Sequence, residues 1–329
     1  MKRRTVLACM TALPALPMIS WGQDRTSPRP HSTQSIIRMV VPASAGGTLD
    51  QLARLLATEM ARLSGQRIII ENKTGGAGAP ARQYVAAGPA DGSLIFMGQV
   101  HEITRAALVR NVPHPMTAQS FTPVAMIGTV PNVLVVNPVV PVKTVQEFVN
   151  WAKGRDLNYG IGSVGNLQNL AGILFQQQTG LKIKAVPYRG SAPAINDLLS
   201  GQIQMLFETM PATLGQIGAG KMRPLATTAD RRSVALPQVP TFAEAGLPKM
   251  QMTTWYGAFV RAGTPASVTQ PIAALIAEAL LTPNLQTAWR EAGMTAAPYL
   301  SGAKFSEFVN AEQHRWVQLV NETGARIEE

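Results

Sequence analysis

The chain of 329 residues is long enough for two domains with a sizeable core in each. With 46% hydrophobic and 15% charged residues, its composition excludes a disordered chain. Lys and Arg outnumber Asp and Glu by 29 to 19, but beyond the first four residues the cations are scattered singly apart from Arg231 and Arg232, so we expect no nucleic-acid partner.

The first 22 residues have the pattern of a secretory signal peptide. Three cations, Lys2 to Arg4, precede an apolar run from Val6 to Ile19, and small residues follow it. A membrane anchor is the less favoured alternative, because the run is short for a bilayer span and two prolines interrupt it. We therefore predict a signal peptide over residues 1–22, a flexible leader over 23–35 and an exported mature protein.

The only cysteine, Cys9, lies inside this predicted signal peptide. The mature chain would then have no thiol, which excludes a disulfide framework, a thiolate metal site and a cysteine nucleophile. A lipoprotein anchor at Cys9 has the wrong geometry, because almost no apolar stretch precedes it.

The segment after the leader alternates between strands and helices. IIRMVVP predicts a short buried strand, and the helix that follows begins at Thr48, which forms a T-x-x-Q capping box with Gln51, and ends at Gly65. The strand RIIIEN, a glycine-rich turn, a helix opened by Pro80 and the strand SLIFMG come next. This alternation predicts a parallel sheet with helices on its faces.

The alternation resumes after residue 130. VPNVLVVNP predicts a strand, Thr144 and Glu147 cap the helix TVQEFVNWAKG, and Asn166 and Gly180 bound the helix NLQNLAGILFQQQTG. Further strands are predicted at LNYGIG, KIKAVPY, IQMLFET and WYGAFV, one helix at SAPAINDLLSG, and three helices after the last strand.

We expect an α/β fold of two lobes, each a mostly parallel sheet flanked by helices, with a ligand cleft between them. Lobe 1 is predicted to contain residues 36–129 and 226–329, and lobe 2 residues 130–225. The chain is expected to cross between the lobes near Ile127–Pro131 and Met222–Ala226.

The stretch VPASAGGTLDQLAR ends a strand, turns at Gly46 and Gly47, and begins a helix. Free N–H groups at a helix N-terminus attract anions, but the Lys of a phosphate-binding loop is missing here, which favours an anion smaller than a triphosphate. Similar small-residue turns precede helices at 75–78, 160–165 and 189–191. Backbone donors from several helix ends in two lobes would clamp a small dianion or trianion.

Gly160, Gly162 and Gly165 match the G-x-G-x-x-G dinucleotide fingerprint in spacing and in context. The fingerprint also needs an acid at the end of the next strand, where KIKAVPYRG offers only Arg189, which would favour a 2′-phosphate. An NADP-linked oxidoreductase using these three glycines is therefore one alternative to an anion-binding turn.

IGSVG is a near match to the G-x-S-x-G nucleophile elbow, with Ser163 as the nucleophile. Asp197 or Asp230, followed by His314, would complete the chain order of a hydrolase triad. However, the elbow needs a small residue where Ile161 stands, and His314 lies in the middle of an amphipathic helix. A secreted serine hydrolase is the second alternative.

Two further titratable residues lie near the predicted strand ends. His101 follows a strand end, where it would act either as a general base or as a hydrogen-bonding residue of a loop. Asp50 lies in a first helical turn, where an acid complements the helix dipole.

Several segments together resemble the solute receptors of tripartite tricarboxylate transporters, the Bug proteins. From Ile36 to the C-terminus they are VPASAGGTLDQLAR, ENKTGGAG, ADGSLIFMG, FTPVAMIG, LVVNP, VPYRGSAPAINDLLSGQIQMLF, RPLATT, LPQVPTFAEAGLP and WYGAFVRAGTP. The resemblance implies a two-lobed periplasmic binding protein that closes on a small carboxylate and delivers it to a membrane permease, without catalysis.

The resemblance also implies that backbone amides and waters of two loops, Ser44 to Gly47 and Gly162 to Asn166, hold the carboxylate. The expected partners are a small carboxylate ligand and the permease subunits of a tripartite transporter. We expect a monomer with no cofactor, no metal and no catalytic residue. The candidate ligand-binding residues are Ser44, Ala45, Gly46, Gly47, Asp50, Gly76, Gln99, His101, Gly162, Ser163, Gly165, Asn166, Asn169, Arg189 and Glu208.

Overall fold

The computed structural model describes residues 36–108, 116–117, 119–162, 164–188, 190–294 and 300–323. The predicted signal peptide, the predicted leader, Ser163 and Arg189 lie outside the described residues. The strands are β1 (Ile37–Val41), β2 (Ile68–Asn72), β3 (Leu94–Gln99), β4 (Phe121–Val136), β5 (Leu157–Ile161), β6 (Ile183–Pro187), β7 (Met205–Thr209), β8 (Arg223–Thr227) and β9 (Thr253–Arg261). The helices are α1 (Thr48–Ser64), α2 (Ala79–Ala87), α3 (His101–Leu108), α4 (Val145–Ala152), α5 (Leu167–Thr179), α6 (Ser191–Leu199), α7 (Met210–Gly218), α8 (Ala266–Leu280), α9 (Pro283–Glu291) and α10 (Gly302–Thr323), with short 3-10 turns η1 (Gly76–Gly78) and η2 (Pro248–Met250).

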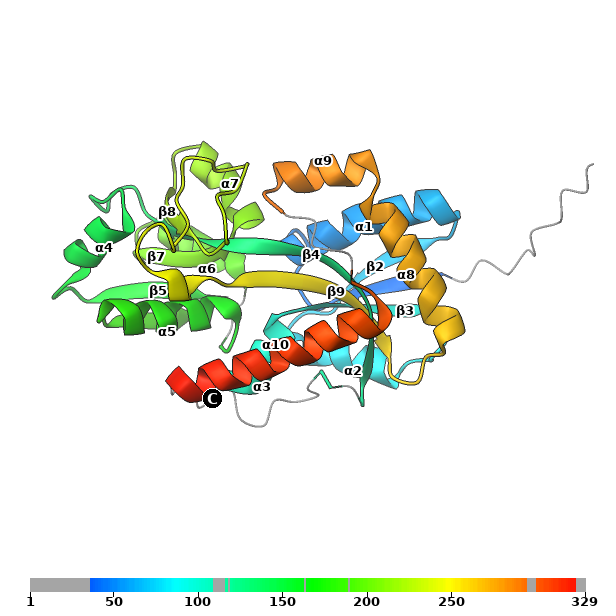
Figure 1. The fold of residues 1–329 in the computed structure, drawn as a ribbon. Helices are drawn as coiled ribbons and strands as arrows, with labels where there is room; N and C mark the ends of the chain where they lie inside the picture. The colour runs from blue at the N-terminus through cyan, green and yellow to red at the C-terminus, as the bar shows by residue number, and fades with distance from the viewer. Residues whose placement is uncertain are drawn as a thin grey trace, which may run out of the picture. The chain divides into compact units, whose positions relative to one another are not determined.

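These strands form one sheet in the order β2-β1-β3-β9-β4-β7-β5-β6, and β8 also pairs with β4 (Figure 1). β1 is parallel to β2 and β3, and β5 is parallel to β6 and β7. The parallel pairing predicted from the alternation of strands and helices is therefore confirmed for these two groups. β4, β8 and β9 are antiparallel to their partners.

β4 is the strand that connects the two parallel groups. Its residues from Phe121 to Pro131 pair with β9, and those from Asn132 to Val136 pair with β7. The sequence predicted a strand only from Val130 onward, because Pro123 and Pro131 usually mark the ends of strands. The predicted crossing near Ile127–Pro131 lies within this continuous strand, and the division into two lobes stays a prediction.

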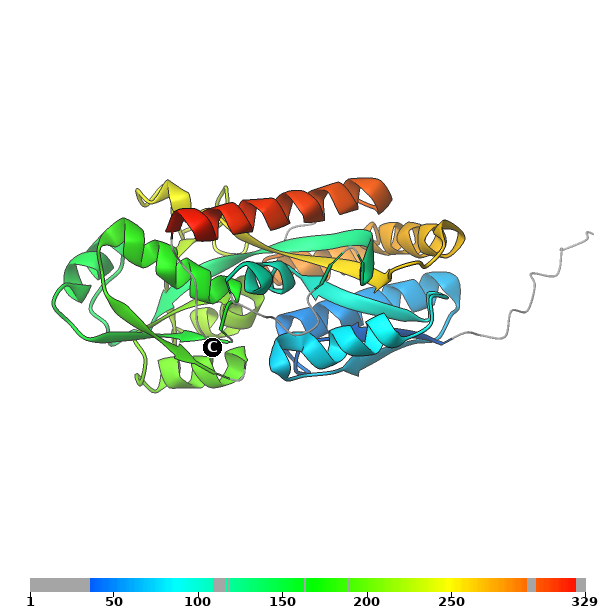
Figure 2. The ribbon, with the colours of Figure 1, turned by 90° about the horizontal axis from the view of Figure 1, so that it is seen from below.

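The helices cover the sheet with apolar faces. α1 packs beside α8 and β2, α6 packs on β5 and β7, and α5 packs on β7. α10 packs against α3 and β4, and Figure 2 shows it lying along the long strands. Among the helices that the structure describes, none combines the length and the apolar character that a membrane span requires.

Several predicted helix ends are confirmed. Thr144 Oγ1 accepts a hydrogen bond from the Glu147 amide at 3.1 Å, as expected of an N-cap. The side chain of Asn166 caps α5 in the same way, and Gly180 ends that helix in the left-handed conformation, as Gly65 does for α1.

Candidate functional site

Helix N-termini from both parallel groups meet where the strands end. Thr48 Oγ1, in the first turn of α1, lies 3.1 Å from Thr209 Oγ1, the N-cap residue of α7. Thr104 Oγ1 of α3 donates to the carbonyl oxygen of Gly165, just before α5, at 3.2 Å. The positive ends of α1, α3, α5 and α7 are therefore brought together by contacts between segments far apart in sequence.

The first loop is held by Asp50, which is almost fully buried. Asp50 Oδ2 accepts from the Gly46 amide at 2.8 Å and from Arg54 Nε at 2.9 Å, and Oδ1 accepts from Asn72 Nδ2 at 2.8 Å. Asn72 also donates to the carbonyl of Ala43 at 2.9 Å. Burial alone would raise the pKa of Asp50, but these hydrogen bonds and the Arg54 charge together keep its pKa below the ordinary value.

The capping box predicted for Thr48 and Gln51 is wrong. Gly47 is the N-cap residue, without a side-chain cap, and Gln51 Nε2 donates instead to the carbonyl of Gly46 at 2.8 Å. Asp50, at the third helical position, accepts from the amide of Gly46, the residue before the N-cap, and so differs from a capping box. The local pattern was ambiguous because both an acid and an amide lie in this first turn.

The second glycine turn rests on a buried ion pair that the sequence did not reveal. Arg82 of α2 pairs with Glu102 of α3, and both side chains are almost fully buried. Arg82 Nη1 also donates to the carbonyl of Ala77 at 2.8 Å. Ala77 is in the left-handed conformation. A Cβ at Gly78 would lie 3.1 Å from Pro42 Cβ and 3.2 Å from Glu102 Oε1, so the segments that follow β1, β2 and β3 meet beside this pair.

The loop between β5 and α5 is held by side-chain amides. Asn169 Oδ1 accepts from the amide of Gly165 at 3.1 Å, and Asn169 Nδ2 donates to Tyr159 Oη at 3.2 Å. Gly165 has a positive φ of 78°, which suits a glycine. The Gly190 amide donates to the carbonyl of Gly162 at 2.9 Å, which brings the turn before α6 beside this loop.

Glu208 is a buried carboxylate near the end of β7, in the second parallel group. Its Oε1 accepts from the Thr209 amide at 2.7 Å, from Thr209 Oγ1 at 3.0 Å and from Gln168 Nε2 at 3.2 Å, and Ser191 donates a further side-chain hydrogen bond. Burial raises the pKa of Glu208 above its ordinary value despite these four donors. Glu208 therefore ties together the starts of α5, α6 and α7.

His101 occupies the first position of α3. Its Nε2 atom is buried and has no hydrogen-bond partner among the described residues. Burial lowers the pKa of His101 to about 4, so the imidazole is neutral at pH 7. A neutral ring can donate from Nε2 to a carboxylate without a compensating charge.

We expect wild-type protein to lose stability between pH 6.5 and pH 4 more steeply than His101→Asn. The unfolded chain binds a proton at its ordinary pKa of 6.5, whereas the folded chain does so only near 4, so the contribution is complete above pH 6.5 and is lost toward pH 4. The difference in slope is up to about 1.4 kcal/mol per pH unit. Urea unfolding between pH 4.5 and 7.5 measures it, and parallel profiles would contradict the assignment.

The remaining candidates are less closely connected. Ser44 and Ala45 are exposed in the first loop, and Gly76 is exposed in η1, with its nearest described contacts in α2. Gln99 ends β3, where it pairs with Tyr256 of β9. The sequence missed Asn72, Arg82, Gln168 and Thr209, although the polar pair Gln168 and Asn169 in the otherwise apolar first turn of α5 was a signal for Gln168.

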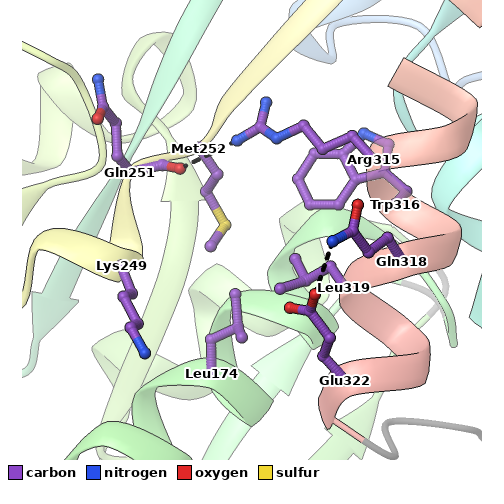
Figure 3. A pocket seen from close by; sticks show the side chains of 9 residues that line it. All are labelled: Leu174, Lys249, Gln251, Met252, Arg315, Trp316, Gln318, Leu319 and Glu322. Atoms are coloured by element: carbon purple, nitrogen blue, oxygen red, sulfur yellow. Dashed lines mark hydrogen bonds between the residues drawn. The ribbon is translucent and has the colours of Figure 1, made fainter. Parts of the chain in front are cut away.

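Two cavities lie elsewhere, and neither is lined by a candidate ligand-binding residue. The first, of about 240 Å³, lies between α5, the segment after η2 and α10. Figure 3 shows Leu174, Met252 and Trp316 lining it, with Lys249 beside them. The second, of about 650 Å³, lies beside α2. In the part of the chain that the structure describes, no group of His, Cys, Asp and Glu could hold a metal ion.

The glycines of the dinucleotide fingerprint have separate structural roles. A Cβ at Gly160 would lie 2.6 Å from Leu206 Cδ2, so this glycine serves the packing of β5 rather than the approach of a phosphate.

His314, the only histidine in the proposed hydrolase order, is exposed on α10 and lies 2.8 Å from the carbonyl of Asn310.

Comparisons with known proteins agree with the geometry. The family model described as tripartite tricarboxylate transporter family receptor matches residues 52–325. BugT from Bordetella pertussis is 31% identical over 296 residues, covering 88% of this chain and 90% of BugT. An R. palustris structure with adipate has a TM-score of 0.83 at 34% identity, covering 88% of this chain and 97% of that one. MatC from Rhodopseudomonas palustris with bound malate has a TM-score of 0.78 at 29% identity, covering 87% and 98%.

The fold and these likenesses define an α/β periplasmic binding protein, a solute receptor rather than an enzyme. The chain belongs to the tripartite tricarboxylate transporter receptor family, that of the Bug proteins. The hydrolase and oxidoreductase alternatives are therefore wrong.

Proposed function

We propose that the mature protein binds a small carboxylate between two lobes, residues 36–129 with 226–329 and residues 130–225, and delivers it to the permease subunits of a tripartite transporter. It acts in the periplasm as a monomer, after removal of residues 1–22. The observation that carries this proposal is the convergence of several helix N-termini on one region, together with the adipate and malate bound by two relatives.

The amides that receive the carboxylate follow from the loop geometry. Gly46 and Gly47 already donate to Asp50 and to the carbonyl of Ser44. By helix geometry the amides of Thr48, Leu49 and Asp50 have no partner within α1, so these three are the donors that the first loop presents. Gly46 and Gly47 shape the approach of the ligand to them.

Titration calorimetry of the chain from Gln23 onward with malate, adipate and citrate tests the proposal. Gly46→Leu is expected to weaken the binding of the preferred carboxylate by about tenfold or more, because its side chain would cover the start of α1. Gly263→Leu is the matched control, since both glycines have φ of 83° and open space around the Cβ position. Equal affinity of the two variants would remove the first loop from the site, and absence of binding to every carboxylate would contradict the function.

A further inference from the structure

Gln168 has a buried acceptor that lacks a hydrogen-bond partner. The residue is only 3% exposed, and its Oε1 has no partner among the described residues. A buried polar atom without a partner is costly in a folded protein, and such atoms usually mark a place for water or ligand. Its location in the first turn of α5 puts it in the region described above.

The orientation of the Gln168 amide follows from Glu208. The Nε2 atom lies 3.2 Å from Glu208 Oε1, which also accepts two hydrogen bonds from Thr209. Rotating the amide by 180° would place Oε1 against this carboxylate oxygen, acceptor against acceptor. The atom left without a partner is therefore the carbonyl oxygen, which accepts and cannot donate.

A second buried atom without a partner lies on the neighbouring helix. His101 Nε2 belongs to the first turn of α3, three residues before Thr104, which donates to the carbonyl of Gly165. Gln168 in turn lies three residues after Gly165. Residues three apart share one face of a helix, so His101 lies on the face of α3 that carries the contact with Gly165, and Gln168 lies in the first turn of the helix that follows this contact.

We propose that Gln168 Oε1 accepts a hydrogen bond from a hydroxyl or amino group of the ligand, so that the receptor selects hydroxy- or amino-carboxylates over carboxylates without such a donor. This inference rests on the proposed function. A plain dicarboxylate offers only acceptors at neutral pH, and its second carboxylate would lie against Gln168 Oε1 and the Glu208 carboxylate. A hydroxyl or an amine donates to Gln168, while the carboxylate beside it accepts from the helix amides and from His101.

Pairs of acids that differ by one hydroxyl test the selection: malate and succinate, lactate and propionate, and mandelate and phenylacetate. In whichever pair binds, titration calorimetry on wild-type protein is expected to show that the hydroxy acid binds at least about tenfold more tightly than its partner. The reason is that an analogue without the hydroxyl leaves the buried acceptor of the site unpaired. Aspartate against succinate tests the amine in the same way.

Gln168→Met removes the acceptor at nearly constant volume and is expected to abolish the difference within each pair. Gln146→Met, the same change at an exposed position of α4, should keep it. Succinate bound as tightly as malate by wild type would overturn the inference while leaving the carboxylate receptor intact. A hydroxyl preference that survives in Gln168→Met would overturn the role of Gln168. Failure of every acid to bind would contradict the proposed function itself. The wild-type comparison stands even if the variant does not fold.

Discussion

Replacement of Arg82 by Met is expected to lower the free energy of unfolding by about 3 kcal/mol or more. The substitution leaves the buried Glu102 carboxylate without the guanidinium that faces it and removes the hydrogen bond to the carbonyl of Ala77. Because this pair lies beneath the turn at Gly78 and beside Pro42, we also expect weaker ligand binding. Urea unfolding measures the stability, and calorimetry on the folded fraction measures the affinity.

The double variant with Arg82→Met and Glu102→Leu is the control for this prediction. It also removes the buried Glu102 carboxylate that the single variant leaves without Arg82. The double variant should therefore be more stable than the single variant, although it has lost more polar contacts. If the double variant were less stable than Arg82→Met, the explanation from an uncompensated buried charge would be wrong.

Gly172→Ala is expected to destabilise the protein by about 3 kcal/mol, at the upper end of the usual cost of overpacking. A Cβ at this position of α5 would lie 2.2 Å from Tyr159 Cζ, and Tyr159 is a fully buried residue of β5. Tyr159 Oη is also bonded to Asn169, which holds Gly165, so a displaced ring should disturb the second loop. Thermal unfolding and ligand titration should therefore change together.

Gly180→Ala is the matched control on the same helix. Gly180 has a φ of 72° but nothing lies within 4 Å of its Cβ position, so only the left-handed backbone opposes the change, at a cost of about 1 kcal/mol. Equal effects of the two substitutions would show that the contact with Tyr159 does not determine the cost at Gly172.

Several features that depend only on neighbours in the sequence were predicted correctly, whereas the capping box at the start of α1 was not. Asn166 and Gly180 bound α5 because an N-cap amide and a C-terminal glycine act within one helical turn. The turns after the strands were predicted for the same reason, since glycines at those positions supply conformations that other residues avoid. The fold class followed from this alternation and from the family resemblance.

Features that depend on distant segments were not predicted. The hydrogen bond of Gln168 on α5 requires Glu208 on β7, which is 40 residues away in the sequence. The ion pair of Arg82 and Glu102 joins α2 and α3, and no local pattern in the sequence indicates that these two residues meet. The full length of β4 was hidden by Pro123, because a proline can lie in an antiparallel strand only where its missing N–H is not needed. The ligand-binding residues themselves stay predictions until a bound carboxylate tests them.

The pairing of β9 with both β3 and β4 determines when the sheet can form during folding. β3 has β9 as its neighbour on one side, and β9 lies between β3 and β4 although residues 253–261 come late in the sequence. The first parallel group therefore cannot complete its sheet until most of the chain is available, and such long-range pairings slow folding. A nascent chain that has not yet reached residue 253 would therefore keep the edge of β3 that pairs with β9 unpaired.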